Sequence, residues 1–181
     1  MAGPRDDQSL AVFVVGPESS GSKLTARIAA HVLGVTTFDD WDGSGWCGHE
    51  MRPGNRVCHR SLPFMLPPQW PDFDEWIENH GATHQVRFIV TTRDRSISER
   101  SRIRRFHKGP EQVTKETNTA VHMIQDLLAR ETSTHVHSYE TMVLLGAPYL
   151  NLLYDFLGVE SDFMPEILDG NRPYIAEEPL P

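Results

Sequence analysis

The sequence predicts an α/β domain of three layers, in which helices cover both faces of a mainly parallel sheet. Two stretches, Leu10–Val15 and residues 85–92, are rich in β-branched and aromatic residues and are typical of buried strands. Helical periodicity separates them, and strands that alternate with helices indicate a parallel sheet. A chain of 181 residues has the size of one domain, so we expect a single unit over 1–181.

The first part of the chain is predicted as strand, glycine-rich loop and helix. Apolar residues recur at helical spacing after the loop, at Leu24, Ile28, Ala29 and Leu33. Gly34 ends this helix. Residues 35–81 are predicted as a mainly irregular insertion that holds short strands at 35–38 and 56–60, a loop at 39–48 and a short helix at 72–79.

The second part of the chain alternates in the same way. After the strand at 85–92 we expect helices at 96–106, 113–128 and 150–157, with a short strand at 135–137. The tail from Asp169 onward contains Pro and Gly and is expected to be irregular.

Composition limits the classes of partner. Asp and Glu total 25 against 17 Lys and Arg, for a formal charge of −8. This charge excludes a general coat for nucleic acid or anionic membrane, so any anion site is local. The longest apolar stretch is too short to span a bilayer, and the first residues lack the features of a secretory signal. We therefore expect a cytoplasmic protein whose two cysteines, Cys47 and Cys58, are free thiols.

The segment Gly16–Thr25 has the context of a phosphate-binding loop, because it lies between a buried strand and a helix. Glycines let the backbone curl, while the helix N-terminus, the serine hydroxyls and Lys23 supply donors. In a Walker A loop the lysine precedes the hydroxyl that holds Mg²⁺, whereas here Ser22 precedes Lys23. The order favours a metal-free phosphate loop. A nucleotide or small-molecule kinase and a non-catalytic nucleotide-binding module are the alternatives.

A second anion site is predicted at Arg93, directly after the strand at 85–92. Ligands of parallel sheets bind at the carboxyl ends of strands, and an arginine there can pair with a phosphate at two points. Ser98 and Ser101 on the following helix can each add a hydroxyl. Seven arginines lie between residues 87 and 105, and those at 100–105 are expected to form a solvated basic helix face.

Two phosphate sites at neighbouring strand ends suit a ligand with a 5′- and a 3′-phosphate. The chain resembles the sulfotransferases that use 3′-phosphoadenosine 5′-phosphosulfate, a family with a fold like that of the P-loop nucleoside triphosphate hydrolases. The resemblance lies in the loop 17–22, in Arg93 with Ser101 eight residues later, in Tyr139–Glu140 and in Phe156–Gly158. One departure is Glu18, which stands where many members have a lysine.

The resemblance implies transfer of a sulfuryl group to a hydroxyl or amine of a small-molecule or carbohydrate acceptor. The product of the donor is adenosine 3′,5′-bisphosphate, and neither a metal nor a nucleic-acid or membrane partner is expected. The insertion at 35–81 then lies on the acceptor side. The residues implied to bind the nucleotide are Pro17, Ser19, Ser20, Gly21, Ser22, Lys23, Leu24, Arg93 and Ser101, with Ser98 as the rival of Ser101.

His59 and Lys23 are the predicted catalytic residues. Lys23 stabilises the leaving phosphate, and a histidine suits the general base because its pKa lies near neutrality. His59 lies in a segment similar to the family's strand that carries a lysine and a catalytic histidine before Leu–Pro. Alignment on Leu62–Pro63 puts His59 in the lysine position, so it either takes the acceptor's proton or binds the sulfuryl group. The other candidates for the base are His49, Glu18, Asp39 and Asp40.

Overall fold

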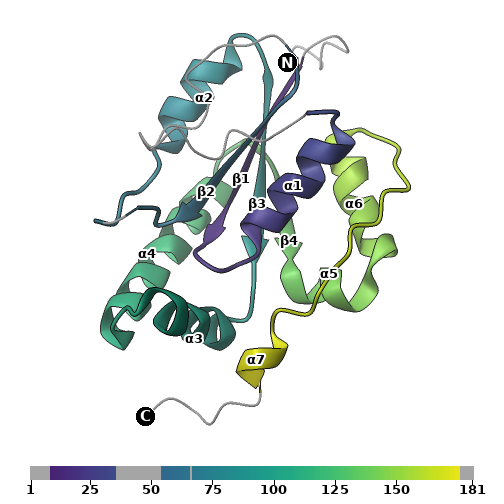
Figure 1. The fold of residues 1–181 in the computed structure, drawn as a ribbon. Coiled ribbons are helices and arrows are strands. Elements are labelled where there is room, and N and C mark those ends of the chain that lie inside the picture. Colours follow the sequence, from purple (N-terminus) through teal and green to yellow (C-terminus); the bar gives the residue numbers. More distant parts are fainter. Residues whose placement is uncertain (1–8, 36–53, 66, 176–181) are drawn as a thin grey trace.

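The structure, a computed structural model, describes residues 9–35, 54–65 and 67–175 (Figure 1). Its strands are β1 (Leu10–Pro17), β2 (Arg56–Leu62), β3 (Gln85–Thr92) and β4 (Ser133–Ser138). Its helices are α1 (Ser22–Val32), α2 (Phe73–Gly81), α3 (Arg95–Phe106), α4 (Pro110–Leu128), α5 (Tyr139–Leu145), α6 (Ala147–Leu157) and α7 (Arg172–Ile175).

The four described strands form one sheet in the order β2-β1-β3-β4, and every pair is parallel. The central strands β1 and β3 carry the two apolar stretches of the sequence. Each residue from Ala11 to Val15 is fully buried, because helices cover both faces of the strand. The predicted parallel α/β sheet is therefore confirmed.

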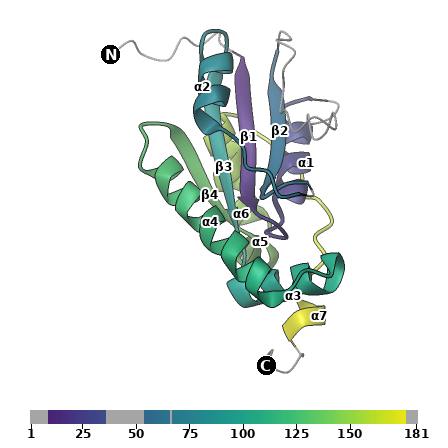
Figure 2. The ribbon, with the colours of Figure 1, turned by 90° about the vertical axis from the view of Figure 1, so that its left-hand side faces the viewer.

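The helices form two layers, one on each face of the sheet (Figures 1 and 2). On one face, Val12, Val14 and Ile89 pack with apolar residues of α1, α5 and α6. On the other face, Phe13 and Phe88 pack with residues of α2 and α4. The end of the sheet toward which the strand arrows point faces α3 and α7 (Figure 1).

One tryptophan of the predicted insertion belongs to the core. Trp76 is 3% exposed and stacks on Phe13 with ring centroids 4.7 Å apart. Trp70 is half-buried against the same cluster. Trp41 and Trp46 lie outside the described residues, so the structure bears only on Trp70 and Trp76.

Two helices were not expected from the sequence. α5 begins directly after β4, where the Ser138 hydroxyl accepts a hydrogen bond from the amide of Thr141 at 3.2 Å. The expectation of an irregular tail is wrong for 172–175. There α7 forms because the carbonyl of Asn171 accepts from the amides of Tyr174 and Ile175.

Two expectations from composition concern described residues. Cys58 is buried and forms no disulfide with another described residue, whereas Cys47 lies outside the described residues, so the expectation of two free thiols stays a prediction. None of the helices described combines the length and the apolar character that crossing a membrane requires.

His137 is an ionisable group held inside the core. It is 1% exposed, its ring stacks on Tyr149 at 4.9 Å, and its Nε2 lies 3.5 Å from the sulfur of Met142. Burial, followed by the nearby His135, lowers the pKa of His137 from 6.5 to about 4. The folded protein therefore keeps this imidazole neutral at pH values where the unfolded chain protonates it.

We predict that His137 makes the stability of the fold depend on pH. Between pH 6.5 and about 4 the unfolded chain binds the proton and the folded chain does not, so the free energy of unfolding falls as the pH falls. The full loss for this shift is about 3 kcal/mol. Urea unfolding from pH 7 to pH 4 measures it. His137→Leu should make the free energy of unfolding depend less on pH, whereas His122→Leu, at an exposed position, should leave that dependence unchanged. The same pH dependence in both variants would contradict the assignment to His137.

Candidate functional site

The predicted phosphate loop connects β1 to α1 by a sharply curled backbone. Ser19 and Gly21 have φ angles of 70° and 90°, in the left-handed region. A Cβ atom at Gly21 would lie 2.7 Å from Cδ2 of Tyr139, so both the φ angle and the close ring require glycine. The residues Glu18–Gly21 thus turn within four positions and lead directly into the first turn of α1.

The carbonyl groups of this loop face donors from the β3–α3 region. The Ser98 hydroxyl donates to the carbonyl of Glu18 at 3.2 Å, and Nη1 of Arg93 donates to the carbonyl of Ser19 at 2.9 Å. Among the described residues, no backbone carbonyl accepts from the amides of Gly21, Ser22 or Leu24. Such first-turn amides have no partner within their own helix, so they are donors for an anion.

The side chain of Ser20 holds the loop against β3. Its hydroxyl is 2.7 Å from the hydroxyl of Thr91, and both residues are buried. Gly16 permits this contact, because a Cβ there would lie 2.2 Å from Oγ1 of Thr91 and 2.5 Å from Oγ of Ser20. The Ser20 hydroxyl therefore has a role in the fold, and the donors that the loop leaves without a backbone acceptor among the described residues are the amides of Gly21, Ser22 and Leu24.

His59 lies beside the start of α1, next to the predicted loop. It belongs to β2 and pairs in register with Val14 of β1, on the face covered by α1. Its Nε2 is 2.9 Å from the hydroxyl of Ser22, and the residue is 8% exposed. Lys23, the next residue of α1, is exposed. The two predicted catalytic residues thus lie at the same helix N-terminus.

Arg93 donates hydrogen bonds to three oxygen atoms of the chain. Besides the Ser19 carbonyl, Nε donates to Oδ1 of Asn171 at 2.7 Å and Nη2 donates to the carbonyl of Gly170 at 2.7 Å. The guanidinium also lies over the ring of Tyr139, 5.0 Å from its centroid. Nε and Nη2 form the side-on edge that pairs with an oxyanion at two points, and here the chain's own oxygens occupy that edge.

Both candidate serines of α3 contact the loop. Ser98 donates to the backbone of Glu18, and the hydroxyl of Ser101 lies 3.4 Å from the hydroxyl of Ser19. Asp94 starts the helix by accepting from the amide of Ile97 at 3.0 Å. The hydrogen bonds from Ser96 and Ile97 lower the pKa of Asp94. This capped helix presents both serines to the loop.

Tyr139 and Glu140 fasten the segment 168–171 over Arg93. The Tyr139 hydroxyl donates to the carbonyl of Leu168 and accepts from the amide of Gly170, each at 2.9 Å. One carboxylate oxygen of Glu140 accepts from the side-chain amide of Asn171 at 3.0 Å. The sequence did not predict the roles of Gly170 and Asn171, and the one local signal for them was the Tyr–Glu pair directly after β4.

The expectation of a solvated basic face at 100–105 is wrong for Arg102. Arg104 and Arg105 are exposed, but Arg102 is completely buried and pairs with Glu18 and Glu116. The carboxylate of Glu18, a candidate for the general base, is therefore engaged with a buried guanidinium.

Three other candidates for the base, Asp39, Asp40 and His49, lie outside the described residues. Within 9–35, 54–65 and 67–175, no three His, Cys, Asp or Glu side chains gather in a way that could hold a metal ion.

No protein-family model matches the chain, and no curated protein matches its sequence. The function must therefore be argued from the residues and their geometry.

We predict that Asn171 competes with an anion for Arg93. Asn171→Ala removes the acceptor on Nε, so adenosine 3′,5′-bisphosphate should bind about three- to tenfold more tightly in titration calorimetry. Asn151→Ala, at an exposed position of α6, is the matched control and should leave the affinity unchanged. Unchanged or weaker binding by Asn171→Ala would show that the segment 168–171 does not compete.

Proposed function

We propose that this protein is a sulfotransferase that moves a sulfuryl group from 3′-phosphoadenosine 5′-phosphosulfate to a hydroxyl or amine acceptor. One observation carries the proposal: Arg93 donates to the carbonyl of Ser19 at 2.9 Å. The two anion-binding elements predicted from distant parts of the sequence therefore meet at one edge of the sheet. A single nucleotide with phosphates at both ends can contact both elements.

Each phosphate has a matching set of donors. The amides of Gly21, Ser22 and Leu24, with Lys23, suit the 5′-phosphate at the helix N-terminus. Arg93, with Ser98 or Ser101, suits the 3′-phosphate once Asn171 and Gly170 release its Nε and Nη2. In sulfuryl transfer, a bond forms from the acceptor oxygen or nitrogen to sulfur and the bond from sulfur to the 5′-phosphate oxygen breaks. Donors fixed near that oxygen stabilise the charge that develops on it, as in phosphoryl transfer.

The acceptor's proton requires a base near the same phosphate, and His59 is the group we assign to it. Its imidazole is oriented by the contact with Ser22, the first residue of α1. A neutral imidazole takes the proton from the acceptor as the new bond to sulfur forms. Ser22 thus links the base to the helix N-terminus that receives the leaving phosphate.

The features of this loop favour sulfuryl transfer over a Mg·ATP kinase. Lys23 occupies the position at which a kinase loop holds the magnesium-binding hydroxyl. β3 ends in Thr91–Thr92, and the Thr91 hydroxyl contacts Ser20, whereas in a kinase of this type an aspartate closes the corresponding strand.

Calorimetry with three ligands tests the proposed nucleotide. We expect adenosine 3′,5′-bisphosphate to bind with the same affinity in the presence and absence of Mg²⁺, and more tightly than ADP or Mg·ATP. Arg93→Ala should weaken this binding by about tenfold or more, because a charge-assisted two-point contact is lost. Arg105→Ala, at an exposed position of α3, is the control. A preference for Mg·ATP would favour the kinase instead.

Replacement of His59 tests the proton transfer. Transfer of labelled sulfuryl groups to a panel of phenols, alcohols and sugars identifies an acceptor, and the rate is then measured on the best one. His59→Ala should lower kcat by about 10²- to 10⁴-fold while bisphosphate affinity stays within about twofold. His122→Ala should be as active as the parent. Equal rates in the parent and His59→Ala would remove His59 as the base, and binding without transfer to any acceptor would favour a non-catalytic module.

A further inference from the structure

Glu18 belongs to the predicted phosphate loop, and its amide, its carbonyl and its carboxylate all form hydrogen bonds. Its amide donates to the carbonyl of Leu62 at 3.2 Å, and its carbonyl accepts from Ser98. Its carboxylate oxygen Oε2 accepts from Nε of Arg102 at 3.0 Å and from Nζ of Lys108 at 2.8 Å. Backbone and side chain together connect this residue to β2, α3 and the turn before α4.

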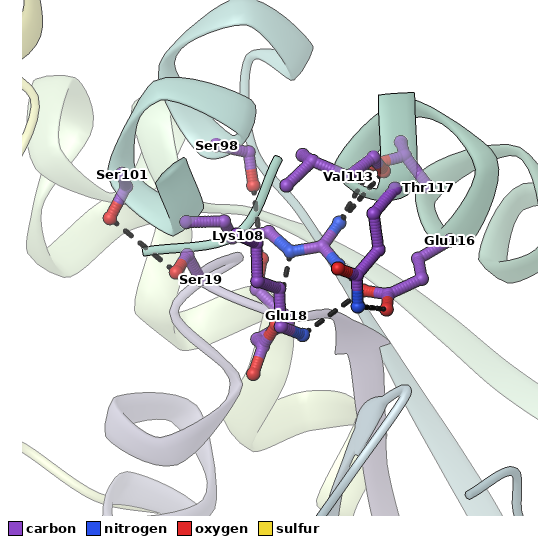
Figure 3. Close-up of polar contacts among 10 residues, drawn as sticks. Glu18, Ser19, Ser98, Ser101, Lys108, Val113, Glu116 and Thr117 are labelled. Atoms are coloured by element: carbon purple, nitrogen blue, oxygen red, sulfur yellow. Dashed lines mark hydrogen bonds and ion pairs between the residues drawn. The ribbon is translucent and has the colours of Figure 1, made fainter. Parts of the chain in front are cut away.

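Arg102 donates hydrogen bonds to Glu18, Glu116 and Thr117, three of the residues labelled in Figure 3. The residue is fully buried, and all three of its nitrogen atoms have acceptors. Nε donates to Glu18, Nη2 to Glu116, and Nη1 to Oγ1 of Thr117 at 2.9 Å and the carbonyl of Val113 at 3.2 Å. A guanidinium satisfied in this way has one orientation, so it fixes the carboxylate that it contacts.

Lys108 completes a cluster with balanced charges. Its ammonium is 2.8 Å from Glu18 and 3.0 Å from Glu116, and the residue is 7% exposed. Arg102 and Lys108 supply two positive charges, and Glu18 and Glu116 supply two negative charges. Removal of one partner from such a buried set leaves an uncompensated charge, which is strongly unfavourable. Three of the four residues come from α3, α4 and the turn between them, and Glu18 alone comes from the loop.

We propose that Glu18 is a positioning residue that sets the place of the phosphate loop. Its carboxylate, held by Arg102 and Lys108, anchors the loop to the α3–α4 hairpin, so that the amides of Gly21 and Ser22 converge on a phosphate. Glu18 acts through the backbone and does not contact the ligand. This assignment rests on the proposed nucleotide site, and it gives Glu18 a role other than proton transfer.

Positioning and simple electrostatics predict opposite effects for Glu18→Gln. The variant keeps the size of the side chain and removes one negative charge near an anion site. Because the variant removes the repulsion between this carboxylate and the phosphate, electrostatics alone predicts tighter phosphate binding. Loss of the anchor predicts weaker binding, because the loop amides no longer hold one arrangement. The sign of the change therefore separates the two explanations.

The experiment is titration of the parent, Glu18→Gln, Glu18→Asp and Glu99→Gln with adenosine 3′,5′-bisphosphate and with inorganic pyrophosphate. We expect Glu18→Gln to bind the bisphosphate about tenfold more weakly with unchanged stoichiometry, since partial unfolding alone lowers the stoichiometry and not the affinity. Glu18→Asp keeps the charge but is one methylene shorter, so it should bind with intermediate affinity. Glu99→Gln removes a charge from α3 that pairs with Arg95, outside the cluster, and should stay within about twofold of the parent.

Each outcome decides the proposal. If Glu18→Gln binds the bisphosphate as tightly as the parent or more tightly, the proposal is overturned. An affinity of Glu18→Asp equal to that of the parent also overturns it. If Glu18→Gln does not fold, Glu18→Asp alone provides the test. If the parent binds pyrophosphate but not the bisphosphate, and Glu18→Gln weakens the pyrophosphate, the positioning role stands and the sulfotransferase proposal fails. If the parent binds neither ligand, both proposals fail.

Discussion

The arrangement of the site depends on two hydrogen bonds to the carbonyl groups of the phosphate loop. Ser98 donates to the carbonyl of Glu18, and Arg93 donates to that of Ser19. A carbonyl group that leaves water needs a donor, so these bonds fix how the two peptide units are turned. With the carbonyls directed at the β3–α3 region, the amides that follow at Gly21 and Ser22 are left for an external acceptor. The same two bonds bring the second predicted anion group, Arg93, into contact with the first.

Although the protein has a formal charge of −8, the cations near the proposed anion site fall into two sets with different partners. The arginines around α3 do not act as one basic patch. Arg102 and Lys108 are neutralised within the interior by Glu18 and Glu116. Arg93 is held at the end of the sheet by neutral oxygen atoms, so its positive charge is not cancelled by its partners. The electrostatic field at the loop therefore comes from a few charged groups at fixed positions and not from the net charge of the chain.

The elements predicted best are those whose signal lies within a few neighbouring residues. β1 and β3 follow from continuous apolar stretches, and the start of α1 follows from the glycine-rich loop before it. Predictions failed where a distant partner decides the outcome. Periodicity marks Arg102 as one of several arginines on a helix, but its burial depends on carboxylates from the loop and from α4. The predicted role of His59 remains a proposal, although β2 does bring it to Ser22.

Local patterns of residues were sufficient to predict the α/β class, the parallel sheet and the glycine-rich loop between β1 and α1. They were sufficient because strand burial, helical periodicity and glycine turns depend on residues close together in the chain. Only the packing of distant segments decided that Arg93 meets the loop, that residues 168–171 cover its guanidinium, and that Glu18 faces a buried cation pair. Those contacts join residues more than seventy positions apart, and no local rule specifies which of the many charged groups will be neighbours.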